Sequence, residues 1–197
     1  MKKYEEIKNL SFSGSLIGIS EKTMSIHYEK LYKGYVAKWK EINDKLSIIS
    51  KDNANATYSE IRALKLEESF TMNAIILHEN YFDILGGNGE ALGSIVEDII
   101  KDFGSFENWL IDFKAVAMSS RGWGVLGYDF NEGRLKNFLC DAHNLYGVWG
   151  SAPIIALDMY EHAYIIDFGS DRKSYIESFL KNLNWEVIDK KYQKCFK

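Results

Sequence analysis

The chain contains four histidines, His27, His78, His143 and His162, and their surroundings favour metal chemistry. His27 and His78 each lie on the apolar face of a predicted long helix, and two histidines facing inward from neighbouring helices can meet in a bundle core, where metal sites are commonly built. His162 follows Asp158 by four residues. Three imidazoles and one carboxylate suit a first-row metal such as iron, manganese or zinc. The spacing alone leaves two alternatives open, which are buried structural histidines and a structural zinc site.

The first half of the chain is predicted to be helical. Residues 20 to about 46 follow a helical pattern with Ser20 as the N-cap, and the pattern places His27, Leu31 and Tyr35 on one face. A small polar connection at 52–57 leads to a second helix over about 58–85. Its apolar stripe consists of Phe70, Ala74, His78, Tyr81 and Leu85. The Gly-Gly-Asn-Gly sequence at 86–89 ends this helix, so we predict an N-terminal helical hairpin domain over 1–88 and a C-terminal domain over 89–197.

The second half predicts a helix followed by a sheet. An amphipathic stretch begins at Ser105, and residues 122–130 and 134–140 are predicted strands joined by the hairpin turn Asn131-Glu132-Gly133. A third apolar run over 153–157 leads into Asp158, and a helical pattern resumes over 174–183. Helices first, then a helix with antiparallel strands, is the order typical of the α+β class.

The composition bounds the class of protein. The chain has 197 residues, 46% hydrophobic and 26% charged, which are globular values. The net charge is −4 with both signs interspersed, so we expect no nucleic-acid partner. We expect no membrane span, because asparagine, glycines and Pro153 interrupt the longest uncharged stretch, 142–157. Cys140 and Cys195 cannot form a disulfide framework, which favours a reducing compartment and a cytoplasmic location.

Six short blocks carry a more specific signal. They are His27 with Lys30 and Tyr35, His78-Glu-Asn-Tyr-Phe, Phe103-Gly-Ser-Phe-Glu, Gly122-Trp-Gly-Val-Leu, Asp158-Met-Tyr-Glu-His-Ala-Tyr, and Arg172 followed by Ser174-Tyr175 and Asn184-Trp185. In this order, and over nearly the whole chain, the blocks resemble those of the iron/manganese superoxide dismutases. The fifth block is similar to the family signature Asp-x-Trp-Glu-His-Ala-Tyr.

The resemblance implies a fold, a cofactor and an activity. The fold would be an α+β one, with a long antiparallel helical hairpin followed by a domain with a three-stranded antiparallel sheet. One iron or manganese ion per subunit would lie between the halves, held by His27, His78, Asp158 and His162. The activity would be ping-pong redox conversion of superoxide to oxygen and hydrogen peroxide. The resemblance also implies a homodimer, and it leaves open whether dimers pair into tetramers.

The resemblance also assigns roles beside the metal. Tyr35 would act as a gate and hydrogen-bond donor, and the alternative is a tyrosine packed in the hairpin core. His143 would donate a hydrogen bond to the metal-bound solvent and continue toward Tyr35, and the alternative is a surface loop histidine. Trp123 and Tyr160 would form the wall of the metal pocket. We expect these roles to depend on hydrogen bonds that tune the bound solvent.

Two further groups of residues are assigned by the same resemblance. Lys30 and Arg172 would draw the anionic substrate toward the site, although for Lys30 a solvated helix face is an equal alternative. At a two-fold dimer interface, Glu161 of each subunit would accept the free ring N–H of His162 in the other. The residues expected near that contact are Ser120, Arg121, Tyr164, Leu31 and Ile165.

Four positions depart from the family pattern. Tyr160 replaces a tryptophan, Ala74 stands where iron-type members often carry glutamine, and Leu31 and Ile165 replace a histidine and a tyrosine that bond across the dimer interface. The last two read as an exchange of a polar contact for a packed one. The departures support one alternative function, a catalytically weak metal-binding homologue that serves as a dimeric scaffold or metal buffer. Nothing in the sequence separates iron from manganese.

Overall fold

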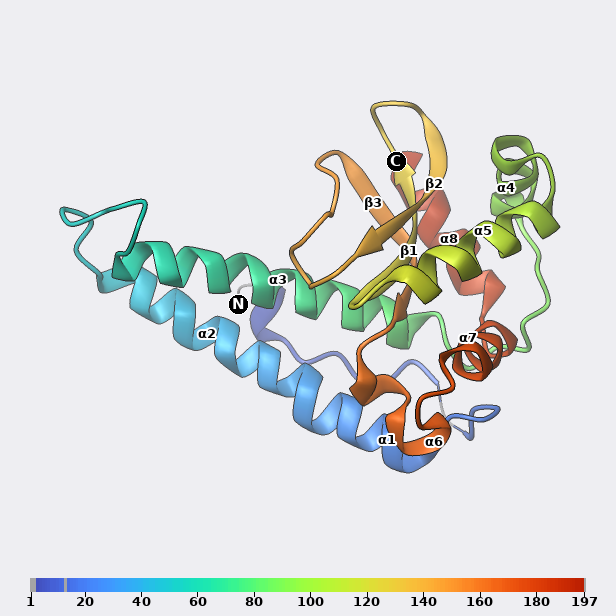
Figure 1. Cartoon of the computed structure of the whole chain (residues 1–197), viewed down its shortest axis with the longest axis horizontal. Helices are drawn as coiled ribbons and strands as arrows, with labels where there is room; N and C mark the ends of the chain where they lie inside the picture. The colour runs from blue at the N-terminus through green and yellow to red at the C-terminus, as the bar shows by residue number, and fades with distance from the viewer. Residues whose placement is uncertain (1–2, 13, 197) are drawn as a thin grey trace.

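The computed structural model describes residues 3–12 and 14–196 and shows an α+β fold (Figure 1). The helices are α1 Glu21–Ile26, α2 Lys33–Ile48, α3 Glu60–Asp83, α4 Ser94–Phe103, α5 Phe106–Ser119, α6 Ile165–Phe168, α7 Arg172–Lys181 and α8 Trp185–Gln193. The strands are β1 Trp123–Asp129, β2 Arg134–Cys140 and β3 Ser151–Asp158. A π-helix spans His27–Tyr32, and 3₁₀ turns span Lys3–Glu5, Glu161–Ala163 and Lys194–Phe196. The predicted fold class is confirmed.

The helical hairpin begins at the predicted N-cap. The Ser20 hydroxyl accepts a hydrogen bond from the Thr23 amide, which satisfies one of the free N–H groups at the start of α1. α1, the π-helix and α2 continue without a break to Ile48, and α3 returns antiparallel along α2 (Figure 1). The second helix begins two residues later than predicted, because Ser59 caps it by accepting from the Arg62 amide. α3 ends at Asp83, and Gly86 then adopts a φ of +83°.

The π-helix is the one part of this hairpin that the sequence pattern did not predict. An α-helix turns by about 100° per residue, so the eight residues from His27 to Tyr35 would overshoot two full turns by about 80°. A π-helix bonds each amide to the carbonyl five residues back, as Lys33 does to Tyr28, and has more residues per turn. The eight residues therefore come closer to two complete turns, and Tyr35 lies on the side of His27.

The sheet has the order β2-β1-β3, and both pairings are antiparallel. The predicted turn joins β1 to β2, where Gly133 has a φ of +66° and donates to the Asp129 carbonyl. Trp123 at the start of β1 pairs with Asp158 at the end of β3. Directly paired residues project from the same face of a sheet. The register therefore places the Trp123 indole beside the Asp158 carboxylate.

The two halves share a core. α3 packs against β3, while α5 packs on β1 and β2 and α8 on β3 (Figure 1). The largest fully buried side chains include Trp109, Trp123 and Tyr81, which come from both halves. The boundary at residue 88 stays a prediction. Among the residues that the structure describes, no helix is both long and apolar enough to cross a membrane.

Candidate metal centre

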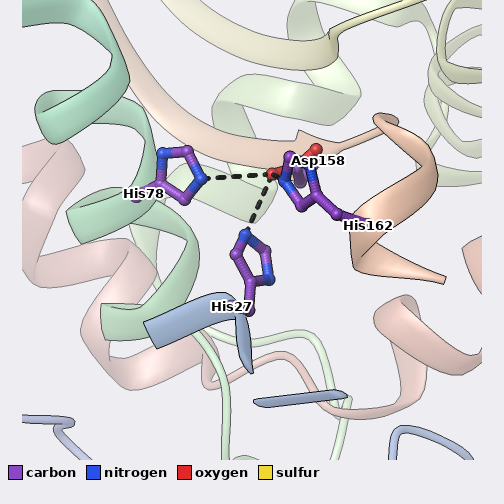
Figure 2. A group of neighbouring side chains, drawn as sticks. All are labelled: His27, His78, Asp158 and His162. Atoms are coloured by element: carbon purple, nitrogen blue, oxygen red, sulfur yellow. Dashed lines mark hydrogen bonds and ion pairs between the residues drawn. The ribbon is translucent and has the colours of Figure 1, made fainter. Parts of the chain in front are cut away.

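Four side chains converge at the junction of the hairpin and the sheet (Figure 2). The Nε2 atoms of His27 and His162 each lie 3.1 Å from Asp158 Oδ2, and His78 Nε2 lies 3.5 Å from the same oxygen. One ligand atom from each residue lies within 4.8 Å of all the others. His27, His78 and Asp158 are fully buried, and His162 is partly exposed. The structure thus brings together the four residues that the resemblance named.

Local structure aims each of these atoms. His78 sits inside α3, and its Nδ1 lies 2.7 Å from the Ala74 carbonyl; this contact holds the hydrogen at Nδ1 and leaves the Nε2 lone pair free. Asp158 ends β3, where its Oδ1 accepts the Tyr160 amide hydrogen at 2.9 Å. This bond directs Oδ2 toward the three histidines. The 3₁₀ turn Glu161–Ala163 then bends the chain so that His162 faces back to Asp158.

Burial sets the charge of the cluster. Loss of water lowers the pKa of His27 and lowers that of His78 well below its ordinary value, so both rings are neutral at pH 7. Burial alone would raise the pKa of Asp158, but the nearby charge of His162 and hydrogen bonds from His162 and His27 outweigh it and hold the pKa low. The site therefore combines the neutral imidazoles of His27 and His78 with one carboxylate.

This donor set fits a first-row metal ion. Three imidazole nitrogens and one carboxylate oxygen suit iron or manganese and leave further coordination positions open. His78 Nε2 is buried and has no hydrogen-bond partner among the described residues, although it points into the cluster. A buried polar atom without a partner is costly unless something else satisfies it, and a bound cation would do so.

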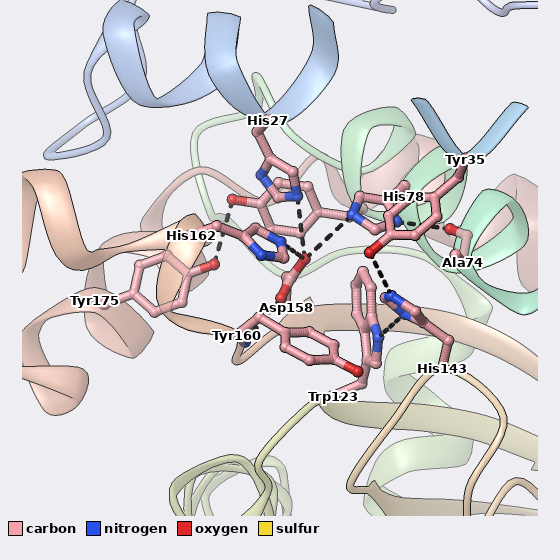
Figure 3. Close-up of polar contacts among 11 residues, drawn as sticks. His27, Tyr35, Ala74, His78, Trp123, His143, Asp158, Tyr160, His162 and Tyr175 are labelled. Atoms are coloured by element: carbon pink, nitrogen blue, oxygen red, sulfur yellow. Dashed lines mark hydrogen bonds and ion pairs between the residues drawn. The ribbon is translucent and has the colours of Figure 1, made fainter. Parts of the chain in front are cut away.

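A second set of side chains, from α2, β1 and the loop after β2, lies beside the cluster (Figure 3). Trp123 Nε1 donates to His143 Nδ1 at 2.9 Å, and His143 Nε2 lies 3.1 Å from the Tyr35 hydroxyl. The Tyr35 ring in turn lies 5.3 Å from the His78 ring. His143 is only 4% exposed, so it is not the surface histidine that the sequence left as an alternative. Burial lowers the pKa of His143 to about 4.

Tyr160 stands between two of the histidines. Its ring stacks on His162 at 5.4 Å with an interplanar angle of 11°, and it lies 4.9 Å from the His143 ring. Burial raises the pKa of Tyr160 to about 12, so the hydroxyl stays protonated at neutral pH. With Trp123, whose ring lies 5.1 Å from His78, Tyr160 borders the cluster in the manner that the resemblance implies.

The two basic residues expected to guide the substrate differ in their surroundings. Lys30 is exposed. Arg172 is half-buried, and its guanidinium donates to the carbonyls of Ala117 and Ser120 at the end of α5. This contact stabilises the carbonyl end of α5, since cations are favourable there. The sequence did not indicate it. A role of either residue in attracting superoxide stays a prediction.

The residues expected at a dimer interface divide into exposed and buried ones. Glu161 and Arg121 are exposed, Ile165 is 45% exposed and Leu31 is half-buried. Tyr164 and Ser120 are buried within the chain, where the Tyr164 ring contacts Tyr175 and the Ser120 hydroxyl donates to Val116. The surface that a second copy can reach here is therefore formed by the first four residues.

Three aromatic residues near the site were not singled out for function from the sequence. Phe70 contacts His143 at 4.6 Å, and Tyr81 contacts His27 at 5.0 Å. The hydroxyl of Tyr175 donates to that of Tyr81 at 3.3 Å, and both side chains are fully buried. Phe70 and Tyr81 lie on the apolar stripe of the second helix, so their pattern indicated only core packing. The Tyr175 contact joins α3 to α7 and has no local signal.

Comparison with known proteins places the chain. The family model for iron/manganese superoxide dismutases, C-terminal domain, matches residues 91–191. The superoxide dismutase [Fe] of Aquifex pyrophilus is 43% identical over 188 residues, which cover 93% of this chain and 88% of that protein. The superoxide dismutase [Fe] of Cupriavidus metallidurans is 38% identical over 87% of each chain, and superoxide dismutase [Mn] 1 of Halobacterium salinarum is 30% identical over 90% of this chain and 88% of that protein. The match to the family model and the identity over most of the chain show that the chain belongs to the iron/manganese superoxide dismutase family.

Proposed function

We propose that this protein is a superoxide dismutase that uses one iron or manganese ion per chain, held by His27, His78, Asp158 and His162. One observation carries the assignment, namely the convergence of three Nε2 atoms and one carboxylate oxygen in a buried site. Family membership supplies the reaction. When bound, the ion supplies one-electron redox chemistry, by which two superoxide anions and two protons become oxygen and hydrogen peroxide.

The protein residues set the charge and shape of the site. Neutral His27 and His78 offer lone pairs without placing positive charge in the core, and Asp158 contributes one negative charge that favours a more highly charged cation. Trp123 and Tyr160 pack beside the ligand rings and hold them in place. Lys30 adds positive potential at the surface of an acidic protein, which attracts an anionic substrate.

Tyr35 is the residue best placed to supply protons. Burial raises the pKa of Tyr35, and the charge of Asp158 raises it further, so its hydroxyl remains protonated. The hydroxyl bonds to His143, and the ring lies against His78. It can therefore hydrogen-bond a small anion beside the ligands while staying connected to His143. Tyr35 and His143 are the proposed catalytic residues.

We also propose that two copies form a two-fold dimer beside this site. Glu161 is exposed next to the partly exposed His162, so Glu161 of one subunit can accept the His162 ring N–H of the other. Leu31 and Ile165 form the apolar part of this surface. Free thiols at Cys140 and Cys195 support a cytoplasmic location, where glutathione and thioredoxin keep thiols reduced.

The test combines elemental analysis with superoxide decay on one preparation. The purified full chain is stripped of metal, reloaded separately with iron, manganese or zinc, and assayed for the decay of a superoxide pulse per bound ion. We expect about one ion per chain and decay only with iron or manganese. A chain that holds metal yet leaves the decay at the rate of buffer would instead be the inactive metal-binding homologue.

A further inference from the structure

We infer that Trp123 fixes His143 as the tautomer protonated at Nε2, so that His143 gives its only ring hydrogen to Tyr35, and Tyr35 rather than His143 is left to donate to an anion at the metal. The inference rests on the proposed function and deepens it. It makes Trp123 a positioning residue, because Trp123 acts on the anion only through His143 and Tyr35.

The first step follows from the chemistry of the indole. The Nε1–H group of tryptophan can only donate, and in this structure it lies 2.9 Å from His143 Nδ1. His143 Nδ1 must therefore present a lone pair. A ring protonated at Nδ1, alone or together with Nε2, would place two hydrogens between the same two nitrogens. The neutral ring with its hydrogen on Nε2 is the form that satisfies this contact.

The second step fixes the direction of the next bond. His143 Nε2 lies 3.1 Å from the Tyr35 hydroxyl oxygen, so its hydrogen is donated to that oxygen. The hydroxyl hydrogen of Tyr35 then has no acceptor among the described residues. Figure 3 shows the Tyr35 hydroxyl directed toward His143, with the Tyr35 ring beside the ring of the ligand His78. The free hydrogen is thus available to an anion bound beside the ligands.

This arrangement differs from the expectation drawn from the sequence, in which His143 itself donates to solvent at the metal. A neutral imidazole carries one ring hydrogen and can donate it to one acceptor only. In this chain that hydrogen already serves Tyr35. The two hydrogen bonds therefore both point the same way, from Trp123 to His143 and from His143 to the Tyr35 hydroxyl.

The first test reads the tautomer directly. The full chain, labelled with ¹⁵N-histidine and loaded with diamagnetic Zn²⁺, is examined by long-range ¹H–¹⁵N correlation spectroscopy, with His143→Gln used to assign the His143 signals. We expect His143 to show a protonated Nε2 and an unprotonated Nδ1. In Trp123→Phe the signals should shift toward protonation at Nδ1, whereas Trp109→Phe, which removes an equally buried indole that donates to Asn137, should leave them unchanged.

The second test asks which way the hydrogen bond between His143 and Tyr35 points. It measures azide binding to the iron-loaded chain by absorption spectroscopy. Without Trp123, the His143 ring can accept the Tyr35 hydrogen, so Trp123→Phe should weaken azide binding roughly tenfold, the usual effect of one lost hydrogen bond to an anion. Tyr35→Phe should weaken it by a similar factor, and the double variant should be no weaker than Tyr35→Phe alone. Additive losses would overturn the inference.

A wild-type His143 that is protonated at Nδ1, or that interconverts between both tautomers, would also overturn it, even if Trp123→Phe fails to fold. Failure of the proposed function is a separate result. An absence of superoxide consumption with the Nε2–H tautomer in place would refute the activity and leave the tautomer assignment standing.

Discussion

Replacing Asp167 by Ala should weaken the contact between α6, which follows His162, and the start of α1, which precedes His27. Asp167 lies in α6, five residues after His162, and its Oδ2 accepts hydrogen bonds from the Ser20 amide at 2.9 Å and the Thr23 hydroxyl at 2.7 Å. Both donors belong to the start of α1, shortly before His27. The carboxylate therefore joins the segment that carries one histidine of the site to the segment that carries another.

The magnitude follows from the two bonds. A hydrogen bond to a charged group contributes about 1.5–3 kcal/mol to stability. Thr23 is fully buried, so its hydroxyl would be left without this acceptor, while Asp167 is only partly buried and water can replace some of the loss at Ser20. Taking the lower end for each bond, we expect Asp167→Ala to reduce the free energy of unfolding by about 3 kcal/mol at pH 7.

The penalty should depend on pH with a definite sign. Burial opposes ionisation of Asp167, but the hydrogen bonds from Ser20 and Thr23 outweigh it and lower the pKa of the carboxyl below its ordinary value of 3.8. A lowered folded-state pKa means that the stabilisation is complete above the unfolded-state pKa and is lost as the pH falls toward the folded-state value. The difference between wild type and variant should therefore shrink below about pH 4.

Urea unfolding of the metal-free full chain at pH 7 and at about pH 3 measures both effects. Asp44→Ala serves as the control, because Asp44 is an exposed aspartate on α2 whose side chain has no hydrogen bond to another described residue. A penalty for Asp167→Ala no larger than the control's at pH 7, or one of the same size at both pH values, would refute the reasoning.

Three further outcomes are expected. His78→Ala and Asp158→Ala should each reduce bound iron or manganese from about one ion per chain to a small fraction by elemental analysis, since both atoms face the centre of the cluster; unchanged metal content would disprove the ligand assignment. His143→Ala should keep most of the metal and slow superoxide decay, because the ring bonds Tyr35 rather than the cluster; full activity would argue against its catalytic role. Leu31→Asp should shift the mass in sedimentation from dimer to monomer, whereas Ile48→Asp, at an exposed site on the far end of α2, should not; a wild-type monomer with full activity would exclude the dimer.

Sequence patterns predicted the features that depend on local chemistry. Ser20 caps α1 as predicted, the amphipathic stretch predicted to begin at Ser105 is α5, and Gly133 closes the hairpin turn, because each feature depends on residues a few positions apart. α4 and α8 were not predicted. α4 is ten residues long and begins after Gly93, which has no side chain that could cap the helix. Short helices of this kind depend on packing against the rest of the fold.

The residues of the site were also predicted in part, according to whether they depend on local motifs or on contacts between distant segments. The four cluster residues could be named from the sequence because their types and motifs are specific to a metal centre. The hydrogen bonds around them could not, because they join distant segments. Trp123 and His143 are twenty residues apart and meet only when β2 and the loop after it fold back over β1. The π-helix that turns Tyr35 toward His27 likewise has no sequence signature.

The burial of the cluster has a kinetic consequence for metal loading. Three of the four side chains have no contact with solvent, and they come from the π-helix, α3 and the end of β3, so we expect entry or exit of an ion to require local separation of the hairpin and the sheet. Such opening costs free energy and is rare in a folded core. An ion captured during folding is then retained for as long as the core stays closed. We therefore expect a bound ion to exchange slowly with free ions while the core stays closed, which a competition between bound iron and added manganese would measure.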